Sequence, residues 1–505
     1  MGTSTRMASR SSASGSVGSG LTGSGFGPWE PTLSPVKFSR LSRRGILLGL
    51  SGPQLMMASL AAGTLMLGLY LGAVVMTFPI ILVFVALGFL SVGGRRLVEW
   101  GPIGARWVWR SAGGQLLFRR RIIKPRPAGT LALPGDAARL RQWVDPETGA
   151  VMVHDPHAAT LTAIVGVSHP AFVLLDPSEK ERRVVGWGRV LATACRSGRL
   201  ASVQVTERTL PDSGKGLADW WTQHGHRSGS WAATTYEELV ERAGPAGERH
   251  ASTISISLDL KAARRAIRAA GGGTRGAAAV LRQEMSTMTA ALRSADLSPS
   301  GWLTPGDLAL ILRGAYDPAV VGALERHGNL GRDLATAGPV SVSESWASLR
   351  SDSAHHCVLW ISEWPRSLVF PGFLAPLLLS SGIRRTFTLL YSPMRNDRAA
   401  RDIRKKKTEY ISDAAQRHRI GQIEDAQQTA EYHDVLQQEA DLTAGHGVLR
   451  TTGLVVVSAN DPDELERAVA AVEQAAIQAS CETRRLWGQQ AQSFAAAALP
   501  LCRTL

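Results

Sequence analysis

The clearest feature in the pattern of apolar and polar positions is the stretch 45–94, which contains no Asp, Glu, Lys, Arg or His. As a helix, these 50 residues would extend ~75 Å, whereas one membrane crossing needs ~30 Å. The pattern therefore predicts a two-helix transmembrane hairpin, with spans near Gln54–Leu71 and Val74–Val92. The turn between them falls at Gly72, Thr77 or Pro79. A buried helical hairpin of a soluble protein is the alternative.

Charge on either side of this stretch predicts its orientation. Residues 1–44 carry six basic side chains and one acidic one, and residues 95–126 carry nine basic and one acidic. Residues 127–505 are nearly balanced, with 41 basic and 40 acidic groups. Because both flanks are basic and the connection between the spans is uncharged, the positive-inside rule places both termini in the cytoplasm. We therefore expect a two-pass protein of the cell membrane.

The segment 95–126 is basic and aromatic, with Trp100, Trp107 and Trp109 among its arginines. Trp favours the boundary between lipid and water, so this juxtamembrane segment would lie along the inner leaflet. A connector packed on the soluble region explains the same residues equally well. Gly68 and Gly72 match the GxxxG motif of contacting membrane helices, but in a chain with 51 glycines we attribute the match to chance.

The rest of the chain divides into a tail and a soluble region. Residues 1–44 are rich in Ser and Gly and predict a disordered tail. Residues 127–505 predict a cytoplasmic α/β or α+β region, because short apolar runs alternate with helical patterns. The predicted strands are Leu161–Val167, Phe172–Leu175, Ser202–Val205, Thr253–Leu258, Cys357–Ile361, Phe387–Tyr391 and Gly453–Val457. The predicted helices are Val184–Ser197, Lys261–Ala270, Gly276–Ala295, Asp397–Ala440 and Asp463–Ser480.

A long charged helical segment, 395–441, has an unusual distribution of charge. Its first half is basic, as at Arg401 and Lys405, and its second half is acidic, as at Glu431 and Glu439. This order opposes the helix dipole at both ends. A hairpin folded near Gly421, a partner surface and a solvated helix face all remain open explanations.

Residues that could support catalysis or bind a metal do not form a recognisable motif. The sequence has no Walker A pattern; Ser213-Gly214-Lys215-Gly216 resembles one only partly and predicts a loop. His154, Asp155 and His157 predict a turn, and His224 and His226 a solvated loop. In His355-His356-Cys357, strand alternation turns His356 away from its neighbours and disfavours a three-ligand cluster. The aromatic residues Trp360, Trp364, Phe370 and Phe373 are typical of a core. We therefore assign no catalytic, cofactor-binding or metal-binding residues, and no cofactor.

The order of these features resembles a known group of proteins. The hairpin Leu55–Val92, bracketed by Arg43-Arg44 and Arg95-Arg96, resembles the PrgI-like inner-membrane proteins of conjugation systems. The soluble region resembles the amino-terminal, non-nucleotide domain of type IV secretion ATPases. That second likeness rests on the charged segment Arg395–Ala440, the strand Gly453–Val457, the helix from Asp461, and Phe494–Leu501 with its Leu499-Pro500-Leu501. The sequence continues for four residues after Leu501, without the nucleotide-binding half of those ATPases.

The resemblance implies an integral membrane component of conjugation or type IV secretion systems of high-G+C Gram-positive bacteria. Such a protein would be a non-catalytic structural and coupling component. Its partners would be the lipid bilayer, a separate type IV secretion ATPase and other secretion components, and it could form an oligomer. A membrane-anchored enzyme with an unrecognised site and a membrane-tethered DNA-binding protein are the alternatives. The balanced charge of 127–505 argues against direct nucleic-acid binding.

Overall fold

The computed structural model describes residues 3–4, 36, 38, 51–121, 123, 129–131, 133–169, 171–212, 214–225, 229–243, 247–327, 331–420 and 426–504. Its α-helices are α1 (Gly52–Tyr70), α2 (Val74–Phe89), α3 (Leu97–Ala112), α4 (Pro177–Ser197), α5 (Lys215–His224), α6 (Trp231–Ala243), α7 (Arg264–Ala269), α8 (Gly273–Ser294), α9 (Pro305–Tyr316), α10 (Val321–Arg326), α11 (Ala375–Leu379), α12 (Asn396–Ile420), α13 (Ala426–Thr443), α14 (Pro462–Gln478) and α15 (Gln490–Ala497). Short 3-10 helices are η1 (Gly135–Arg139), η2 (Phe172–Leu174) and η4 (Pro318–Val320).

The strands are β1 (Thr3–Ser4), β2 (Ser91–Val92), β3 (Arg95–Arg96), β4 (Leu117–Arg119), β5 (Arg141–Val144), β6 (Val151–Asp155), β7 (Thr160–Ser168), β8 (Leu200–Pro211), β9 (Glu248–Asp259), β10 (Ser298–Trp302), β11 (Ser341–Glu344), β12 (Leu349–Ser351), β13 (Ala354–Glu363), β14 (Arg384–Met394), β15 (Val448–Ala459) and β16 (Glu482–Arg485).

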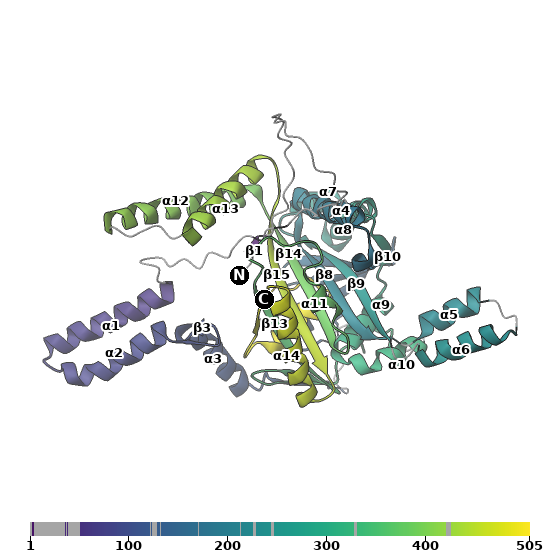
Figure 1. Ribbon diagram of the computed structural model, residues 1–505, viewed down its shortest axis with the longest axis horizontal. Helices are drawn as coiled ribbons and strands as arrows, with labels where there is room; N and C mark the ends of the chain where they lie inside the picture. Colours follow the sequence, from purple (N-terminus) through teal and green to yellow (C-terminus); the bar gives the residue numbers. More distant parts are fainter. Residues whose placement is uncertain are drawn as a thin grey trace, which may run out of the picture.

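One large antiparallel sheet forms the centre of the molecule (Figure 1). Its strand order is β4-β11-β12-β13-β15-β14-β8-β9-β7-β6-β5, with β1, β10 and β16 attached to the sides of β15, β7 and β13. Only β2 and β3 pair apart from it, within the described part of the chain. The mixed α and β composition is confirmed, and the antiparallel pairing makes the fold α+β.

The strands on the two sides of the β8–β14 pair, here called the seam, follow the same order outward from it. In the first half, β9 lies between β8 and β7, and β10 pairs with β7. In the second half, β15 lies between β14 and β13, and β16 pairs with β13. A helix follows the last strand of each half, α9 after β10 and α15 after β16. The chain therefore contains two structural repeats, β5–α9 and β11–α15, related by an approximate two-fold axis at the seam.

The two repeats place their helices on the same faces of the sheet. On one face, Val203 and Ile256 pack in a core with residues of α4 and α8, while Leu359 and Val455 pack in a core with residues of α14. On the other face, α9 and α15 share one continuous core that includes Tyr316 and Phe494. Since successive strand residues point to opposite faces, this division follows the alternation of apolar residues in the central strands.

Buried polar side chains at the seam hold the carboxy-terminal segment on the sheet. Gln204 of β8 donates through Nε2 to the Leu499 carbonyl oxygen at 2.9 Å and accepts from the Cys502 N–H at 2.6 Å. Thr388 of β14 donates to the Ala497 carbonyl oxygen at 2.6 Å. Because both side chains are fully buried, these hydrogen bonds satisfy backbone groups that water cannot reach.

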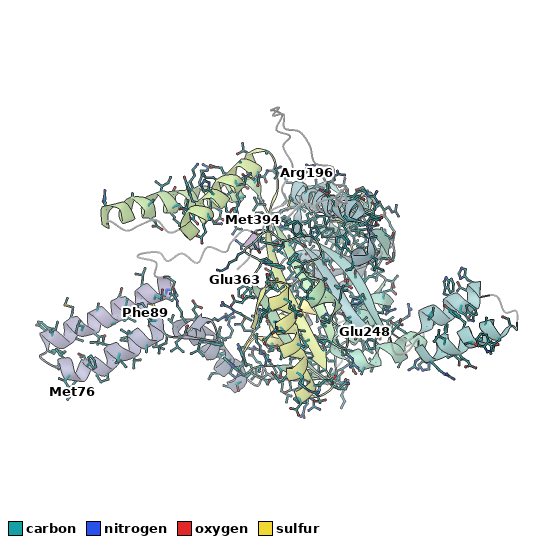
Figure 2. The ribbon with its side chains drawn as sticks, viewed as in Figure 1. Met76, Phe89, Arg196, Glu248, Glu363 and Met394 are labelled. Carbon is teal, nitrogen blue, oxygen red and sulfur yellow. The ribbon has the colours of Figure 1, made fainter. Side chains whose placement is uncertain are left out.

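Helical hairpins occupy the connections between adjacent strands. The pair α5 and α6 joins β8 to β9, and the pair α12 and α13 joins β14 to β15. Because β8 and β14 are antiparallel, these hairpins project from opposite ends of the sheet (Figure 1). Glu248 and Met394, labelled in Figure 2, lie at their bases. A third hairpin, α1 and α2, projects beside α3.

Most predicted elements are confirmed, and two are corrected. The strand predicted at Phe172–Leu175 is the 3-10 helix η2, because a short apolar run without alternation carries no strand period. The helix predicted at Lys261–Ala270 begins later, at Arg264, because the Asp259 carboxylate accepts hydrogen bonds from the N–H groups of Lys261 and Ala262 and forms a turn there. The helical segment predicted at Asp397–Ala440 spans the two helices α12 and α13, and 421–425 lie outside the described residues. The other predicted strands and helices lie within observed ones of the same type, often longer, except at the ends of some helices.

The tail predicted at 1–44 lies almost entirely outside the described residues. Of its described residues, Val36 forms an antiparallel bridge with Val369. Phe38 is buried and stacks on Trp364 with ring centroids 5.1 Å apart. These two positions therefore contact the soluble region.

The seam generates a stability prediction. Gln204→Met should destabilise the chain by about 1–3 kcal/mol, because it leaves the Cys502 N–H buried without an acceptor and removes one of the two donors to the Leu499 carbonyl oxygen. Urea unfolding of the full chain in detergent micelles measures this change. The matched control is Gln283→Met at an exposed position of α8, where we expect a change within about 0.5 kcal/mol. Equal stability of the two variants would contradict the role of Gln204.

Candidate functional site

The pair α1 and α2, here called the apolar hairpin, is the feature that departs most from a soluble fold. Neither helix contains a charged residue. Large apolar side chains are exposed along both; at the tip, Val75 is 87% exposed and Met76, labelled in Figure 2, is 81% exposed. Among the described helices, α1 alone is both long and apolar enough to cross a membrane, while α2 is apolar but shorter. Exposed apolar surface of this extent marks an interaction site.

Small residues bring the two helices of the apolar hairpin together. A Cβ atom placed on Gly68 would lie 2.2 Å from the Thr77 Oγ1 atom, and one on Gly88 would lie 3.2 Å from the Met57 Cβ atom. Near the other end, Gln54 Nε2 donates to the Gly88 carbonyl oxygen at 3.2 Å. Gly68 therefore takes part in helix contact, whereas Gly72 lies in the turn after α1 with no atom within 4 Å of a Cβ placed on it, so the two glycines do not act together as a GxxxG contact motif.

Glycine turns define both ends of α2. Of the three predicted turn positions, Gly72 is the one used, with a φ angle of +67°. After α2, the strands β2 and β3 are joined through Gly93 and Gly94, whose φ angles are +60° and +72°. Two successive positive φ angles are what the tightest β-hairpin turns require. The second predicted span, Val74–Val92, is therefore shorter than expected, because the chain leaves the helix after Phe89.

Helix α3 attaches the apolar hairpin to the sheet through aromatic contacts. The rings of Trp100 and Trp107 lie 6.0 and 5.3 Å from the ring of Trp346, in the turn between β11 and β12. On the opposite side, Trp109 is 77% exposed, beside exposed Val108. Of the two explanations left open for the juxtamembrane segment, packing on the soluble region therefore holds for Trp100 and Trp107. Trp109 instead lies largely exposed, next to exposed Val108.

A buried ion pair fixes the end of α3. Arg110 forms an ion pair with Glu344 of β11, whose side chain is only 1% exposed. Glu344 also accepts a hydrogen bond from the Ala491 N–H at 3.1 Å, in the first turn of α15. Beyond α3, β4 joins the sheet edge beside β11, and Arg484 donates to the Gly94 carbonyl oxygen at 2.9 Å. The apolar hairpin is therefore tied to the second repeat at several points.

The charged helical segment 395–441 is the pair α12 and α13, here called the charged hairpin. Lys407 Nζ lies 2.8 Å from Glu439 Oε2, and Tyr410 Oη donates to Glu431 at 2.9 Å. The predicted hairpin thus brings part of the basic and acidic halves together; its turn, near Gly421, lies outside the described residues. Arg401 and Lys405 remain exposed, with ion pairs only to residues of their own helix.

The histidines outside the core are placed separately. Asp155 accepts hydrogen bonds from the N–H groups of His157 and Ala158, so the turn predicted at His154–His157 is confirmed. His224 is the last residue of α5 and stacks on Trp220, so the loop predicted there is wrong at this position. His226 lies outside the described residues. Within the described chain, no group of three or more His, Cys, Asp or Glu side chains could hold a metal ion.

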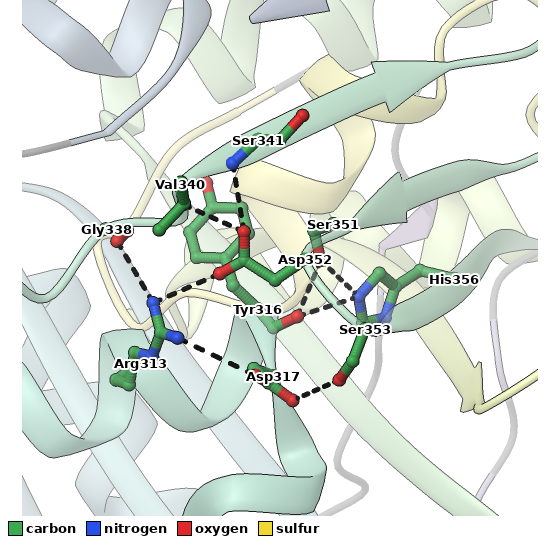
Figure 3. Close-up of polar contacts among 10 residues, drawn as sticks. All are labelled: Arg313, Tyr316, Asp317, Gly338, Val340, Ser341, Ser351, Asp352, Ser353 and His356. Atoms are coloured by element: carbon green, nitrogen blue, oxygen red, sulfur yellow. Dashed lines mark hydrogen bonds and ion pairs between the residues drawn. The ribbon is translucent and has the colours of Figure 1, made fainter. Parts of the chain in front are cut away.

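His356 and Ser351 form the arrangement that most resembles a catalytic pair (Figure 3). Ser351 Oγ lies 2.7 Å from His356 Nε2 and donates to the Tyr316 carbonyl oxygen at 2.6 Å. The other ring nitrogen, Nδ1, lies 2.8 Å from the Ser458 hydroxyl rather than from a carboxylate. Both His356 and Ser351 are 0% exposed. A substrate would have to displace the core to reach them, so this geometry joins strands rather than activating a nucleophile.

Neighbouring charged groups extend the same network. Arg313 of α9 lies 3.1 Å from Asp352 and 3.7 Å from Asp317 (Figure 3). Asp352 accepts hydrogen bonds from the N–H groups of Val340 and Ser341. These contacts fix the β12–β13 turn against the end of α9. As predicted, His356 and Cys357 point to opposite faces, since His356 contacts Phe494 in the shared core and Cys357 packs in the core with α14.

The remaining residues that the sequence singled out have structural positions. Trp360 packs against the shared core, and Trp364 and Phe373 pack in the core with α14, as predicted. Phe370 is exposed. In the partial Walker A match, Gly214 has a φ angle of +72° and is the last residue before α5. Lys215 and Gly216 lie in that helix, so the predicted loop is wrong at these two positions.

Glu344 and Trp346, which hold α3 to the sheet, were not identifiable from the sequence. They lie more than 230 residues after their partners Arg110 and Trp107, and no local pattern links residues so far apart. The one clue in the sequence was Glu344 itself, an acidic residue within a strand. Since ionised carboxylates are rarely buried without a partner, it indicated a basic partner elsewhere in the chain.

Comparison with known proteins gives no family for this chain. No protein-family model matches it, and no curated protein matches its sequence.

The His356 network predicts a dependence of stability on pH. Burial lowers the pKa of His356 to about 4, whereas the imidazole of an unfolded chain has a pKa of about 6.5. The unfolded chain therefore binds the proton first as pH falls. The stability contributed by neutral His356 is complete above pH 6.5 and decreases by about 3 kcal/mol between pH 6.5 and 4.

Urea unfolding of the full chain at pH 7 and pH 4 measures this contribution. His356→Gln should reduce the loss of stability between the two pH values by about 3 kcal/mol. His355→Gln, at a less buried neighbouring position, should retain most of it. If the two variants lose equal stability on acidification, His356 is not the group responsible.

Proposed function

We propose that this chain is a two-pass protein of the cell membrane and a non-catalytic structural and coupling component of a type IV secretion or conjugation machine, acting with a separate motor ATPase. The observation that carries the membrane part is the apolar hairpin. It exposes apolar side chains all round, and its main contacts with the rest of the described chain are to β3 and α3, near its base. A lipid bilayer is the surrounding in which such side chains are favourable.

Helix lengths are consistent with this placement. α1 has 19 residues and α2 has 16, which corresponds to roughly 28 and 24 Å of helix. With the residues of the Gly72 turn and the flanking positions, the pair suits a hydrocarbon layer of ~30 Å with small adjustments. The helical conformation pairs most backbone groups within each span, as spanning segments require, although Pro79 inside α2 has no N–H to donate.

Orientation follows from the ends of the hairpin. The start of α1 and the end of α2 lie together, as the contact between Gln54 and Gly88 requires, and the basic residues Arg95 and Arg96 follow directly. The Gly72 turn at the opposite end is uncharged. The positive-inside rule then places the sheet and both termini in the cytoplasm. Exposed Trp109 and Val108 on α3 would face the inner leaflet, while Trp100 and Trp107 hold α3 to the sheet.

The secretion part of the proposal rests on the resemblance of the sequence features. The charged hairpin, the strand β15, the helix α14 and the Leu499-Pro500-Leu501 segment follow one another in the order expected for the accessory domain of a type IV secretion ATPase. The charged hairpin projects away from the sheet (Figure 1), with exposed basic residues that a partner could contact. Such charges mainly tune the rate and orientation of association.

Labelling in cells tests the membrane topology. A membrane-impermeant maleimide should label Ala73→Cys at the Gly72 turn in intact cells, but Ser12→Cys and Thr504→Cys only after permeabilisation. Burial raises the pKa of the native thiols, Cys195 to about 11 and Cys357 to about 12, so they should react slowly and serve as background. Labelling of the two termini from opposite sides would rule out the two-pass arrangement.

Charge reversal tests the coupling role. The triple change Arg401→Glu, Arg404→Glu and Lys405→Glu should abolish co-purification of the motor ATPase from native membranes at low salt. The melting temperature should stay within a few degrees, because exposed ion pairs contribute about 0–1 kcal/mol each.

The matched control is reversal of three exposed arginines on α7, Arg264, Arg265 and Arg268. This variant should keep the ATPase attached. Loss of stability in the charged-hairpin variant would instead indicate that these charges act within the domain. Purification of the unaltered protein without any ATPase would remove the coupling role.

A further inference from the structure

A cavity of about 1310 Å³ opens beside β9 in the first repeat. The strands β7 and β9 stop pairing at Val167 and Ser252. The residues of β9 before Ser252 therefore have no β7 partner, and the cavity lies beside them. One part of its wall is apolar and comes from α9 and α10, through Leu310, Ile311, Val321 and Leu324. Its volume exceeds the ~300–1,000 Å³ of common small-molecule sites, which leaves room for a long ligand.

Arg208 of β8 lines this cavity as a buried charge without a partner. Its exposed fraction is 6%, and its Nε atom is buried without a hydrogen bond. Among the described residues, no carboxylate forms an ion pair with it. Burial lowers the pKa of Arg208 to about 10. An isolated buried cation is costly, so a bound anion would relieve a real penalty.

The carboxylates nearest to Arg208 are engaged elsewhere. Glu325 forms an ion pair with Arg249. Glu207 accepts a hydrogen bond from Ser252 and lies 3.3 Å from His250 Nδ1. Glu207 also precedes Arg208 by one strand position, so the two side chains point to opposite faces of the sheet. Arg208 therefore has no direct ion pair on the face that carries α9 and α10, and the charges of Glu207 and Glu325 act on it only at longer range.

Another buried arginine of the sheet shows that this arrangement is not a requirement of the fold. Arg385 of β14 is also buried, and its Nε atom likewise has no hydrogen bond, but its two terminal nitrogens donate to the carbonyl oxygens of Ser380 and Leu378. In addition, α10 follows the last helix of the first repeat and belongs to the connection between repeats. The unpartnered charge and part of the apolar wall are thus local features of this cavity.

We propose that the cavity binds an anionic amphiphile, with its carboxylate or phosphate on the Arg208 guanidinium and its acyl chain between β8, α9 and α10. The planar guanidinium can donate two parallel hydrogen bonds to either head group. The apolar wall removes the chain from water. This inference does not depend on the proposed role in secretion.

Photo-crosslinking tests the proposal on the full chain held in amphipol, so that no free detergent competes. The probe is palmitic acid with a diazirine near its methyl end, and its methyl ester is the uncharged comparison. We expect labelled peptides from α9 and α10, with at least tenfold less labelling by the ester. Arg208→Met should also reduce labelling at least tenfold, without lowering the melting temperature, because it removes a buried unpaired charge.

Two further variants keep the result interpretable. Arg366→Met, at an exposed arginine paired with Glu363, should label like the unaltered chain. Val321→Trp, which fills the apolar part, should reduce labelling even if Arg208→Met fails to fold. Equal labelling of Arg208→Met and Arg366→Met, or labelling confined to α1 and α2, would overturn the proposal.

Competition identifies the source of the ligand. Displacement of the probe by free palmitate alone indicates a fatty acid, and displacement by phosphatidylglycerol vesicles indicates a membrane lipid. Displacement by inorganic phosphate alone would show an anion site without an acyl chain and would overturn the proposal. If no competitor displaces the probe, the labelling is non-specific, and this result would also overturn the proposal.

Discussion

Pairing of β8 with β14 is the interaction on which the rest of the fold depends. It joins two repeats into one sheet, and Gln204 and Thr388 on its two strands hold the carboxy-terminal segment across it. That segment carries Phe494 into the core shared by α9 and α15, where it meets Tyr316 and His356. A buried polar seam of this kind has one correct register, because any shift would leave backbone groups unpaired. The register set at the seam therefore fixes the strand positions in both repeats.

The same core connects to the apolar hairpin through one buried carboxylate. Glu344 accepts from Arg110 of α3 and from the first turn of α15, the helix that leads to the seam. A displacement of α3 would disturb both partners of Glu344, and leaving a carboxylate buried without its cation costs several kcal/mol, about 3–5 in measured cases. The hairpin is for this reason rigidly attached rather than tethered by a flexible linker. A force applied to the apolar hairpin would reach the sheet along this contact.

Local patterns predicted the elements well and their arrangement poorly. The uncharged stretch 45–94, the alternating strand Thr253–Leu258 and the helix after Asp461 were identifiable because each carries its period or cap within a few residues. The repeat was not, since the long helix α4 in one half corresponds to the short α11 in the other. Contacts such as Arg110 with Glu344, and the isolation of Arg208 in its cavity, depend on residues far apart in sequence. Only the folded chain brings them together.

The approximate two-fold axis has a geometric consequence for the hairpins inserted at β8–β9 and β14–β15. Each leaves from the far end of its own strand, and the two strands run in opposite directions. A strand of 12 residues such as β8 spans ~40 Å at about 3.3 Å per residue. The sheet therefore separates the bases of the two hairpins by roughly this length. If one partner protein bound each hairpin, the sheet would hold the two partners at a fixed distance and in a fixed relative orientation, without any linker.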